Sequence, residues 1–277
     1  VAHERLPVRN MVMMTAAAGR PVFAIARDAV PYVGTTDTPH GSGPEHWPTV
    51  AAAEVDYLLD TANAHFPASR LARADVLATW AGVRPLIHQP GKAPREMSRR
   101  DEIWRDGPLV TVAGGKLTGF RKMAEQALAA VGVVLGRDVA MPAPLAPLPG
   151  GDRADIAALR TEIATRYQLA APVANRLVRL YGSETFAVLG DTPRPIAPSV
   201  FAEEVRCAVE IEGAETLEDG LYRRLRVAWY LPGESADLVV PCAAAMAELL
   251  GWDDERRRHE IAAVRSRLAS EHAFADS

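Results

Sequence analysis

The segment Gly114-Gly115-Lys116-Leu117-Thr118 has the clearest capacity for chemistry in this sequence. It lies between a short apolar run and a segment with helical periodicity. Glycines let a backbone approach a ligand closely, and a helix start offers unpaired N–H groups and the positive end of the helix dipole. Because Lys116 adds a full positive charge, the segment favours an anion or an electron-rich carbonyl as its ligand. The alternative is an ordinary turn between a strand and a helix.

The spacing of the glycines excludes two common phosphate-binding fingerprints. A P-loop requires Gly-Lys-Ser/Thr at a fixed distance after an earlier glycine, and the chain has no such segment. The dinucleotide fingerprint Gly-x-Gly-x-x-Gly is also missing, because Gly41 and Gly43 are not followed by a third glycine. We therefore expect no complete dinucleotide-binding turn within these 277 residues.

Arg84 lies in the apolar segment Ala81-Gly82-Val83-Arg84-Pro85-Leu86. A buried guanidinium without a partner is very unfavourable. Arg84 is therefore expected either to pair with a carboxylate of the protein or to bind an oxyanion through its planar set of donors. Gly82 would let a ligand or a neighbouring backbone come close.

A third candidate is the segment Gly34-Thr35-Thr36-Asp37, at the end of a predicted strand. Its hydroxyl groups and carboxylate could orient a polyol or the edge of a cofactor. They could equally form an Asx-turn that only shapes the loop. The histidines are scattered at spacings that suggest no metal site.

The elements that must position these residues change in type along the chain. Residues 1–140 alternate strand and helix signals, and residues 141–151 are too rich in proline and glycine for a helix or a central strand. Strands are expected at 11–15, 21–26, 30–35, 75–87 and 109–113, and helices at 48–66 and 117–134. Gly136 is expected to end the second of these helices.

Beyond the proline-rich linker the sequence is almost wholly helical. Apolar stripes predict helices at 153–167, 173–181, 200–212, 221–231, 236–250 and 253–269. Gly251 should end the fifth, and Asp253 or Asp254 should cap the sixth. The predicted fold class is α+β: a portion with a mixed β-sheet at 1–140, then an all-α C-terminal domain at 152–277.

Composition limits the classes of partner. The 31 basic and 35 acidic residues give no basic face for nucleic acid. Between positions 84 and 122, nine basic residues exceed four acidic ones, which fits a small anionic ligand or a solvated face. No apolar run approaches the ~20 residues that span a bilayer. Because only Cys207 and Cys242 are present, a reducing compartment, hence the cytoplasm, is expected.

Taken in order, these segments resemble the FAD-dependent glycerol-3-phosphate dehydrogenase family. The helical tail also resembles that family's end domain, for example through Glu203-Glu204-Val205 and Leu250-Gly251-Trp252-Asp253. The other matching segments are Tyr32-Val33-Gly34-Thr35-Thr36-Asp37-Thr38, Tyr57-Leu58-Leu59 with His65-Phe66, Trp80-Ala81-Gly82-Val83-Arg84-Pro85-Leu86, Gly114-Gly115-Lys116-Leu117-Thr118 and Arg121-Lys122-Met123-Ala124-Glu125.

The resemblance implies oxidation of sn-glycerol 3-phosphate to dihydroxyacetone phosphate, with hydride transfer to FAD. It implies that Arg84 and Lys116 are catalytic and contact the substrate, together with Thr36. It also implies that the cofactor is contacted by Gly114, Gly115, Lys116, Leu117 and Thr118. A cationic pocket suits a substrate with nearly two negative charges, and a positive charge with a helix start stabilises the anion of a reduced flavin.

The same resemblance sets the expected partners and the alternatives. The electron acceptor is expected to be quinone or another acceptor, with peripheral association with the inner membrane if it is quinone, and a homodimer is a further expectation. Because the family's FAD fingerprint should precede Val1, the chain is expected to be a fragment that is inactive alone and binds FAD weakly or not at all. The alternatives are a glycerol-3-phosphate oxidase, a related FAD oxidoreductase, or a non-catalytic helical docking module.

Overall fold

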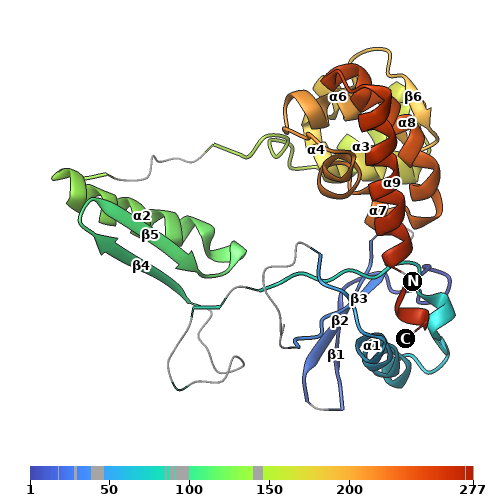
Figure 1. Ribbon diagram of the computed structural model, residues 1–277, viewed down its shortest axis with the longest axis horizontal. Helices are drawn as coiled ribbons and strands as arrows, with labels where there is room; N and C mark the ends of the chain where they lie inside the picture. The colour runs from blue at the N-terminus through green and yellow to red at the C-terminus, as the bar shows by residue number, and fades with distance from the viewer. Residues whose placement is uncertain are drawn as a thin grey trace. The chain divides into compact units, whose positions relative to one another are not determined.

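The computed structural model describes residues 1–17, 19–27, 30–38, 47–84, 86–87, 91, 100–139, 146–271 and 273–276 (Figure 1). The chain forms two compact units. The first comprises Val1–Asp37, Thr49–Ala81 and Pro147–Ser277, and the second comprises Thr38–Pro48 and Gly82–Ala146.

The amino-terminal part of the first unit is a small antiparallel sheet covered by one helix. The strands β1 (Val12–Thr15), β2 (Pro21–Ile25) and β3 (Tyr32–Gly34) pair in chain order, and α1 (Ala52–His65) packs against them (Figure 1). Side chains alternate across a strand, so Val22 and Ala24 of β2 point into the core and are fully buried. The other buried members of this core are Leu6, Val8, Met14, Ala16, Ala62 and Leu71.

The carboxyl-terminal part of the first unit is helical. One of its hydrophobic clusters includes the fully buried side chains of Leu159, Ile163 and Leu177. Its larger elements are α3 (Ile156–Tyr167), α4 (Ala171–Tyr181), α5 (Thr185–Leu189), α6 (Ala202–Glu210), the π-helix η5 (Asp219–Arg224), α7 (Val227–Tyr230), α8 (Pro232–Leu250) and α9 (Asp254–Ser270). The short segments η1 (Arg73–Asp75), η4 (Gly182–Glu184) and η6 (Ala273–Asp276) and the hairpin β6 (Pro195–Ala197)–β7 (Val200–Phe201) complete the unit.

A buried ion pair joins two of these helices. Arg176 of α4 donates to Glu204 of α6 at 2.6 Å and to the backbone carbonyl of Ser199 at 2.5 Å. The Glu204 side chain is fully buried, and it also accepts hydrogen bonds from the backbone N–H of Phe201 and the hydroxyl of Tyr181. A buried charge requires this degree of pairing, so removing either partner should loosen α4 from α6.

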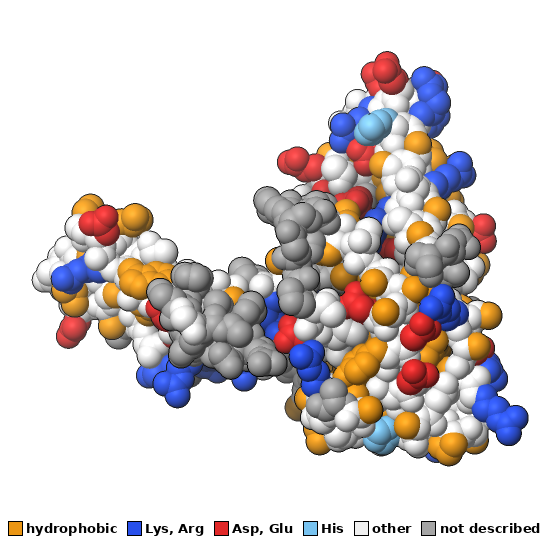
Figure 2. Space-filling view, turned by 60° about the horizontal axis from the view of Figure 1, so that its bottom comes forward, with side chains coloured by type: hydrophobic (Ala, Val, Ile, Leu, Met, Phe, Trp, Pro, Cys, Tyr) orange, Lys and Arg blue, Asp and Glu red, His pale blue; other side chains and the backbone are white. Residues whose placement is uncertain are grey.

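The second unit is a hairpin with a helix packed against it. The strands β4 (Asp101–Asp106) and β5 (Leu109–Gly114) are antiparallel, and η3 (Leu117–Gly119) leads into α2 (Phe120–Leu135), which contacts both strands. Gly136 ends α2 in the left-handed conformation at φ 64°. Hydrophobic side chains lie at the surface of this unit (Figure 2), with Trp104, Leu109 and Phe120 at least 43% exposed.

The predicted α+β class is confirmed, and the carboxyl-terminal region is helical as expected. One predicted strand is wrong: 76–84 and 86–87 contain no regular element, and η1 occupies 73–75. A strand exists only where its backbone groups pair with a neighbour, and no strand of the described residues pairs with this segment. Pro85 could not donate to such a ladder in any case.

Candidate functional site

The glycine turn predicted as a ligand site joins β5 to the helical start of η3 and α2. Gly114 is the last residue of β5, Gly115 and Lys116 follow, and Leu117 and Thr118 begin η3. The five predicted cofactor-contacting residues therefore form one continuous turn. Lys116, Leu117 and Thr118 are exposed, and Leu117 is 89% exposed.

Both glycines have a structural reason that needs no ligand. Gly114 and Gly115 adopt φ values of +74° and +79°, which side chains rarely accept. A Cβ on Gly114 would also lie 2.6 Å from the carbonyl oxygen of Arg100, and one on Gly115 would meet the sulfur of Met123 at 2.5 Å. The left-handed backbone thus favours glycine at both positions, and the carbonyl of Arg100 also excludes a side chain at Gly114.

The start of α2 is electropositive. No side chain caps its first residues, and its first turn contains no acidic residue. Its N–H groups therefore carry the positive end of the helix dipole without a carboxylate to neutralise it. Within the part of the chain that the structure describes, Lys116, directly before η3, has no carboxylate partner, whereas Lys122 of α2 pairs with Glu125 at 2.9 Å. Lys116 is thus suited to an external anion.

Arg84 lies in the segment of the second unit that has no regular secondary structure, and it is exposed. The prediction of a buried guanidinium within a strand is therefore wrong. The physical reason is the missing strand, since side chains are enclosed on a sheet only where neighbouring strands and a covering layer exist.

Thr36 belongs to the first unit, two residues after the end of β3, so it lies on a different unit from Arg84 and Lys116. Its hydroxyl donates to Oε1 of Glu54 at 2.7 Å, and Oε2 of Glu54 accepts from the backbone N–H of Ala51 at 3.2 Å. The oxygen of Thr36 keeps its acceptor capacity, so it can accept a hydrogen bond from a ligand hydroxyl. The peptide bond between Gly34 and Thr35 is cis.

Glu54 was missed by reasoning from the sequence. The available signal was its position three residues after Ala51, where an acidic side chain can reach back to the backbone at the start of α1. That pattern predicts a helix start and does not indicate Thr36 as a partner, because the two residues come from different elements.

A cavity of about 180 Å³ lies in the helical region and contains none of the predicted site residues. It is lined by Arg194 and by residues of α6 and α8, including Glu203, Arg206 and Glu248. Glu203 accepts hydrogen bonds from the backbone N–H and the guanidinium of Arg194. We assign this cavity no part in the predicted chemistry.

The described residues contain no group of three or more His, Cys, Asp and Glu side chains arranged to hold a metal ion. None of their helices has the length and apolar character needed to cross a membrane.

Two family models match the chain. The family described as FAD dependent oxidoreductase matches residues 2–139, and the C-terminal domain of alpha-glycerophosphate oxidase matches residues 145–257. Among curated proteins, the aerobic glycerol-3-phosphate dehydrogenase of Bacillus subtilis (strain 168) is 48% identical over 120 residues, 43% of this chain and 21% of that protein. Its counterpart from Staphylococcus haemolyticus (strain JCSC1435) is 37% identical over 196 residues, 66% of this chain and 35% of that protein.

A solved structure is similar over nearly the whole chain. The glycerol-3-phosphate dehydrogenase from Bacillus halodurans, complexed with FAD, has a TM-score of 0.79 and 28% sequence identity. The similarity covers 99% of this chain and 56% of that one, so the chain spans about half the length of that relative.

Proposed function

Since this chain belongs to the FAD-dependent glycerol-3-phosphate dehydrogenase family, we propose that it contributes part of the site where sn-glycerol 3-phosphate is oxidised. The product is dihydroxyacetone phosphate, formed when the C2 hydroxyl loses a proton and C2 loses a hydride. The observation that supports this most is the exposed Lys116 directly before η3, which leads into the uncapped, positive start of α2. We also propose that residues 1–140 contact the flavin and the substrate, and that residues 152–277 form a separate helical domain.

The residues at this turn fit the edge of a flavin. FAD, when bound, supplies the acceptor for the hydride that leaves the substrate. The proposed contacts are from Gly114, Gly115, Lys116, Leu117 and Thr118. Lys116 and the N–H groups at the helix start would stabilise negative charge at the electron-rich edge of the flavin. No side chain competes for these N–H groups, because the first turn of α2 has neither a capping side chain nor an acidic residue.

Arg84 and Thr36 are proposed to bind the substrate with Lys116. An exposed guanidinium can form paired hydrogen bonds with a phosphate or with a substrate oxygen. Thr36 is proposed to accept a hydrogen bond from a polyol hydroxyl, because its own proton is directed to Glu54. The two cations balance the nearly two negative charges of the substrate.

The test is a comparison of Lys116→Ala and Arg84→Ala with Lys122→Ala in the complete dehydrogenase loaded with FAD. Lys116→Ala and Arg84→Ala are expected to lower kcat/KM for glycerol 3-phosphate by at least about a hundredfold, as loss of a transition-state contact does. Lys122→Ala is the matched control, because it removes an exposed lysine six residues away that pairs with Glu125. Near-normal kcat/KM in Lys116→Ala would exclude the proposed site.

One observation favours a second candidate for the final electron acceptor. The helical region matches the C-terminal domain of alpha-glycerophosphate oxidase, and an oxidase would pass electrons to oxygen. We propose quinone as the first candidate, reached from a cytoplasmic enzyme at the inner face of the membrane, in keeping with the dehydrogenase relatives. Oxygen consumption and quinone reduction, followed in parallel during turnover, distinguish the two.

A further inference from the structure

An aromatic cluster joins the amino-terminal and helical parts of the first unit. Trp80 stacks on Trp229 with ring centroids 5.7 Å apart, and it meets the ring of Tyr230 edge-on at 6.4 Å. Tyr32 of β3 lies 5.8 Å from Trp80 and 6.4 Å from Tyr230. Tyr222 of η5 meets Trp229 edge-on at 5.9 Å. Such aromatic contacts stabilise the junction beyond the apolar area they bury.

Two polar contacts strengthen the same junction. The guanidinium of Arg27 lies 4.3 Å from the centre of the Tyr230 ring, within the range of a cation–π interaction. The hydroxyl of Thr79 donates to the backbone carbonyl of Glu271 at 2.6 Å, just after α9 ends. The junction is therefore held by stacking, by charge and by a hydrogen bond, from both sides of Trp80.

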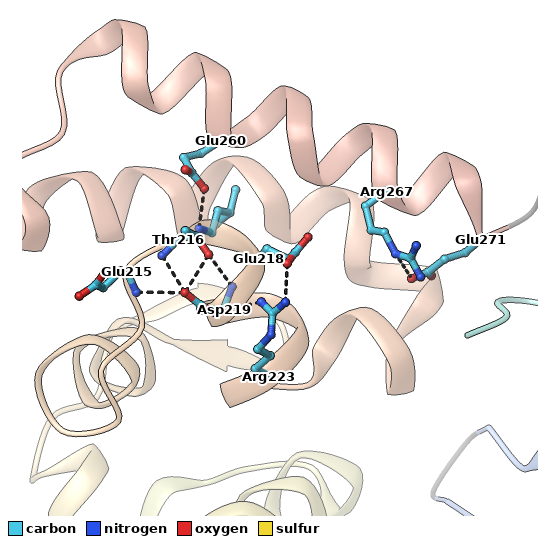
Figure 3. A network of polar contacts seen from close by, with 9 residues as sticks. Glu215, Thr216, Glu218, Asp219, Arg223, Glu260, Arg267 and Glu271 are labelled. Carbon is cyan, nitrogen blue, oxygen red and sulfur yellow. Dashed lines mark hydrogen bonds and ion pairs between the residues drawn. The ribbon is translucent and has the colours of Figure 1, made fainter. Parts of the chain in front are cut away.

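The segment that carries Tyr222, Trp229 and Tyr230 is itself fixed by a polar network (Figure 3). Asp219 at the start of η5 accepts from the backbone N–H and the hydroxyl of Thr216, and it pairs with Arg223 at 2.9 Å. Glu260 of α9 accepts from the backbone N–H of Leu217 at 2.8 Å. The network ties the start of η5 to α9, so the aromatic surface has a rigid support.

Two of the proposed substrate-binding residues come shortly after a member of the aromatic cluster in the sequence. Thr36 is four residues after Tyr32, and Arg84 is four residues after Trp80. Four residues of extended chain reach at most about 14 Å. Because Tyr32 and Trp80 are held on one aromatic surface, the starting points of the segments that lead to Thr36 and to Arg84 are limited. Trp229 and Tyr230 can therefore act on these segments without touching the substrate.

We propose that Trp229 of the helical domain is a positioning residue for glycerol 3-phosphate oxidation. It would act through Trp80 on the segment that leads to Arg84, and through Tyr230 and Tyr32 on the segment that leads to Thr36. The helical domain would thereby have a role in substrate binding. This proposal rests on the proposed function of Arg84 and Thr36.

The experiment uses Trp229→Ala and Trp229→Phe, with Phe186→Ala as the matched control. Phe186 also takes part in an aromatic contact of the helical domain, with Tyr167 at 6.3 Å, and it packs on the core of α3 and α4. The indole N–H of Trp229 is buried and has no hydrogen-bond partner among the described residues. Trp229→Phe therefore keeps an aromatic ring and removes no hydrogen bond.

The first measurement is amide hydrogen exchange in the 277-residue chain, which needs no activity. Trp229→Ala is expected to speed exchange in β3 at 32–34, which pairs with β2, Trp229→Phe to restore the slow exchange largely, and Phe186→Ala to leave it unchanged. If Trp229→Ala does not fold, Tyr230→Leu tests the same junction by removing the contacts with Arg27 and Tyr32.

The second measurement is steady-state kinetics of the complete dehydrogenase loaded with FAD. Trp229→Ala is expected to raise KM for glycerol 3-phosphate about tenfold with kcat nearly unchanged, because a misplaced substrate residue weakens binding more than the bond-breaking step. An equal loss of kcat and stability in Trp229→Ala and Phe186→Ala, with unchanged exchange at 32–34, would overturn the proposal. Absence of glycerol 3-phosphate turnover in the unsubstituted enzyme would instead refute the proposed function, and the exchange result would still decide the positioning role.

Discussion

The carboxyl group of Glu271 lies on an almost completely buried side chain. It follows α9, and its side chain is 1% exposed. Burial raises the pKa of Glu271 from its ordinary value of 4.5 to about 7, because a buried carboxylate loses its hydration. Tyr222 and Arg267 face it and favour the charged form. Arg267 is 3.5 Å away, a long contact (Figure 3), so burial outweighs it.

This pKa predicts a pH-dependent contribution to stability. The folded state holds the Glu271 proton more tightly than the unfolded state, so the contribution is complete below about pH 4.5 and is lost as pH rises to about 7. The loss should be on the order of 2–3 kcal/mol in the free energy of unfolding. Glu271→Gln keeps the shape and cannot ionise, so its stability should rise relative to the unsubstituted chain across this range.

Urea denaturation of both proteins at a series of pH values measures this difference. Other carboxylates change the stability of both proteins alike, so only the difference reports on Glu271. Glu215→Gln, an exposed residue of the network in Figure 3, serves as the control. A difference between the unsubstituted chain and Glu271→Gln that stays constant between about pH 4.5 and 7 would contradict the raised pKa.

At the scale of elements, local residues decide where helices end. Gly136 and Gly251 end α2 and α8 in the left-handed conformation, as predicted. Asp253 caps α9 by accepting a hydrogen bond from the backbone N–H of Arg256 at 2.7 Å. Each of these features involves residues within a few positions of one another, and this is why the sequence predicts them.

Removing the cap of α9 should destabilise the helical region. Asp253→Ala leaves the N–H of Arg256 without its acceptor and removes a negative charge from the helix start, which costs about 1 kcal/mol. Asp253→Asn should lose much less, because asparagine also accepts at this position. Thermal unfolding followed by circular dichroism measures both variants, and equal losses in the two would show that the cap contributes little.

The features that were not predicted depend on pairing and packing between segments, which the pattern within one segment does not record. β4 has the sequence Asp-Glu-Ile-Trp-Arg-Asp, with no apolar alternation, and it is a strand because it pairs with β5. The predicted strand at 75–87 fails for the opposite reason, since its apolar residues find no paired neighbour among the described residues. The glycine turn was predicted because it is one continuous segment. The stacking of Trp80 on Trp229 was not, because no local pattern records it.

At the scale of the whole molecule, the two compact units do not follow the order of the sequence. The helical carboxyl-terminal residues belong to the same compact unit as β1, β2, β3 and α1, while the hairpin and α2 form the other unit. A chain that leaves one unit and returns to it needs long-range contacts to hold that unit together. The aromatic cluster around Trp80 supplies such contacts between the helical region and β3.

The sequence also predicts how strongly the 277-residue chain binds FAD. Its 277 residues include the turn proposed to contact one edge of FAD, but no Gly-x-Gly-x-x-Gly turn to hold the pyrophosphate. The 277-residue chain, mixed with FAD and passed through a desalting column, should therefore retain much less than one flavin per protein molecule, measured by flavin absorbance. A complete dehydrogenase treated in the same way is the control and should retain its flavin. Stoichiometric flavin on the 277-residue chain would show that contacts at the glycine turn and around it suffice, because affinity for the cofactor would then not require the fingerprint.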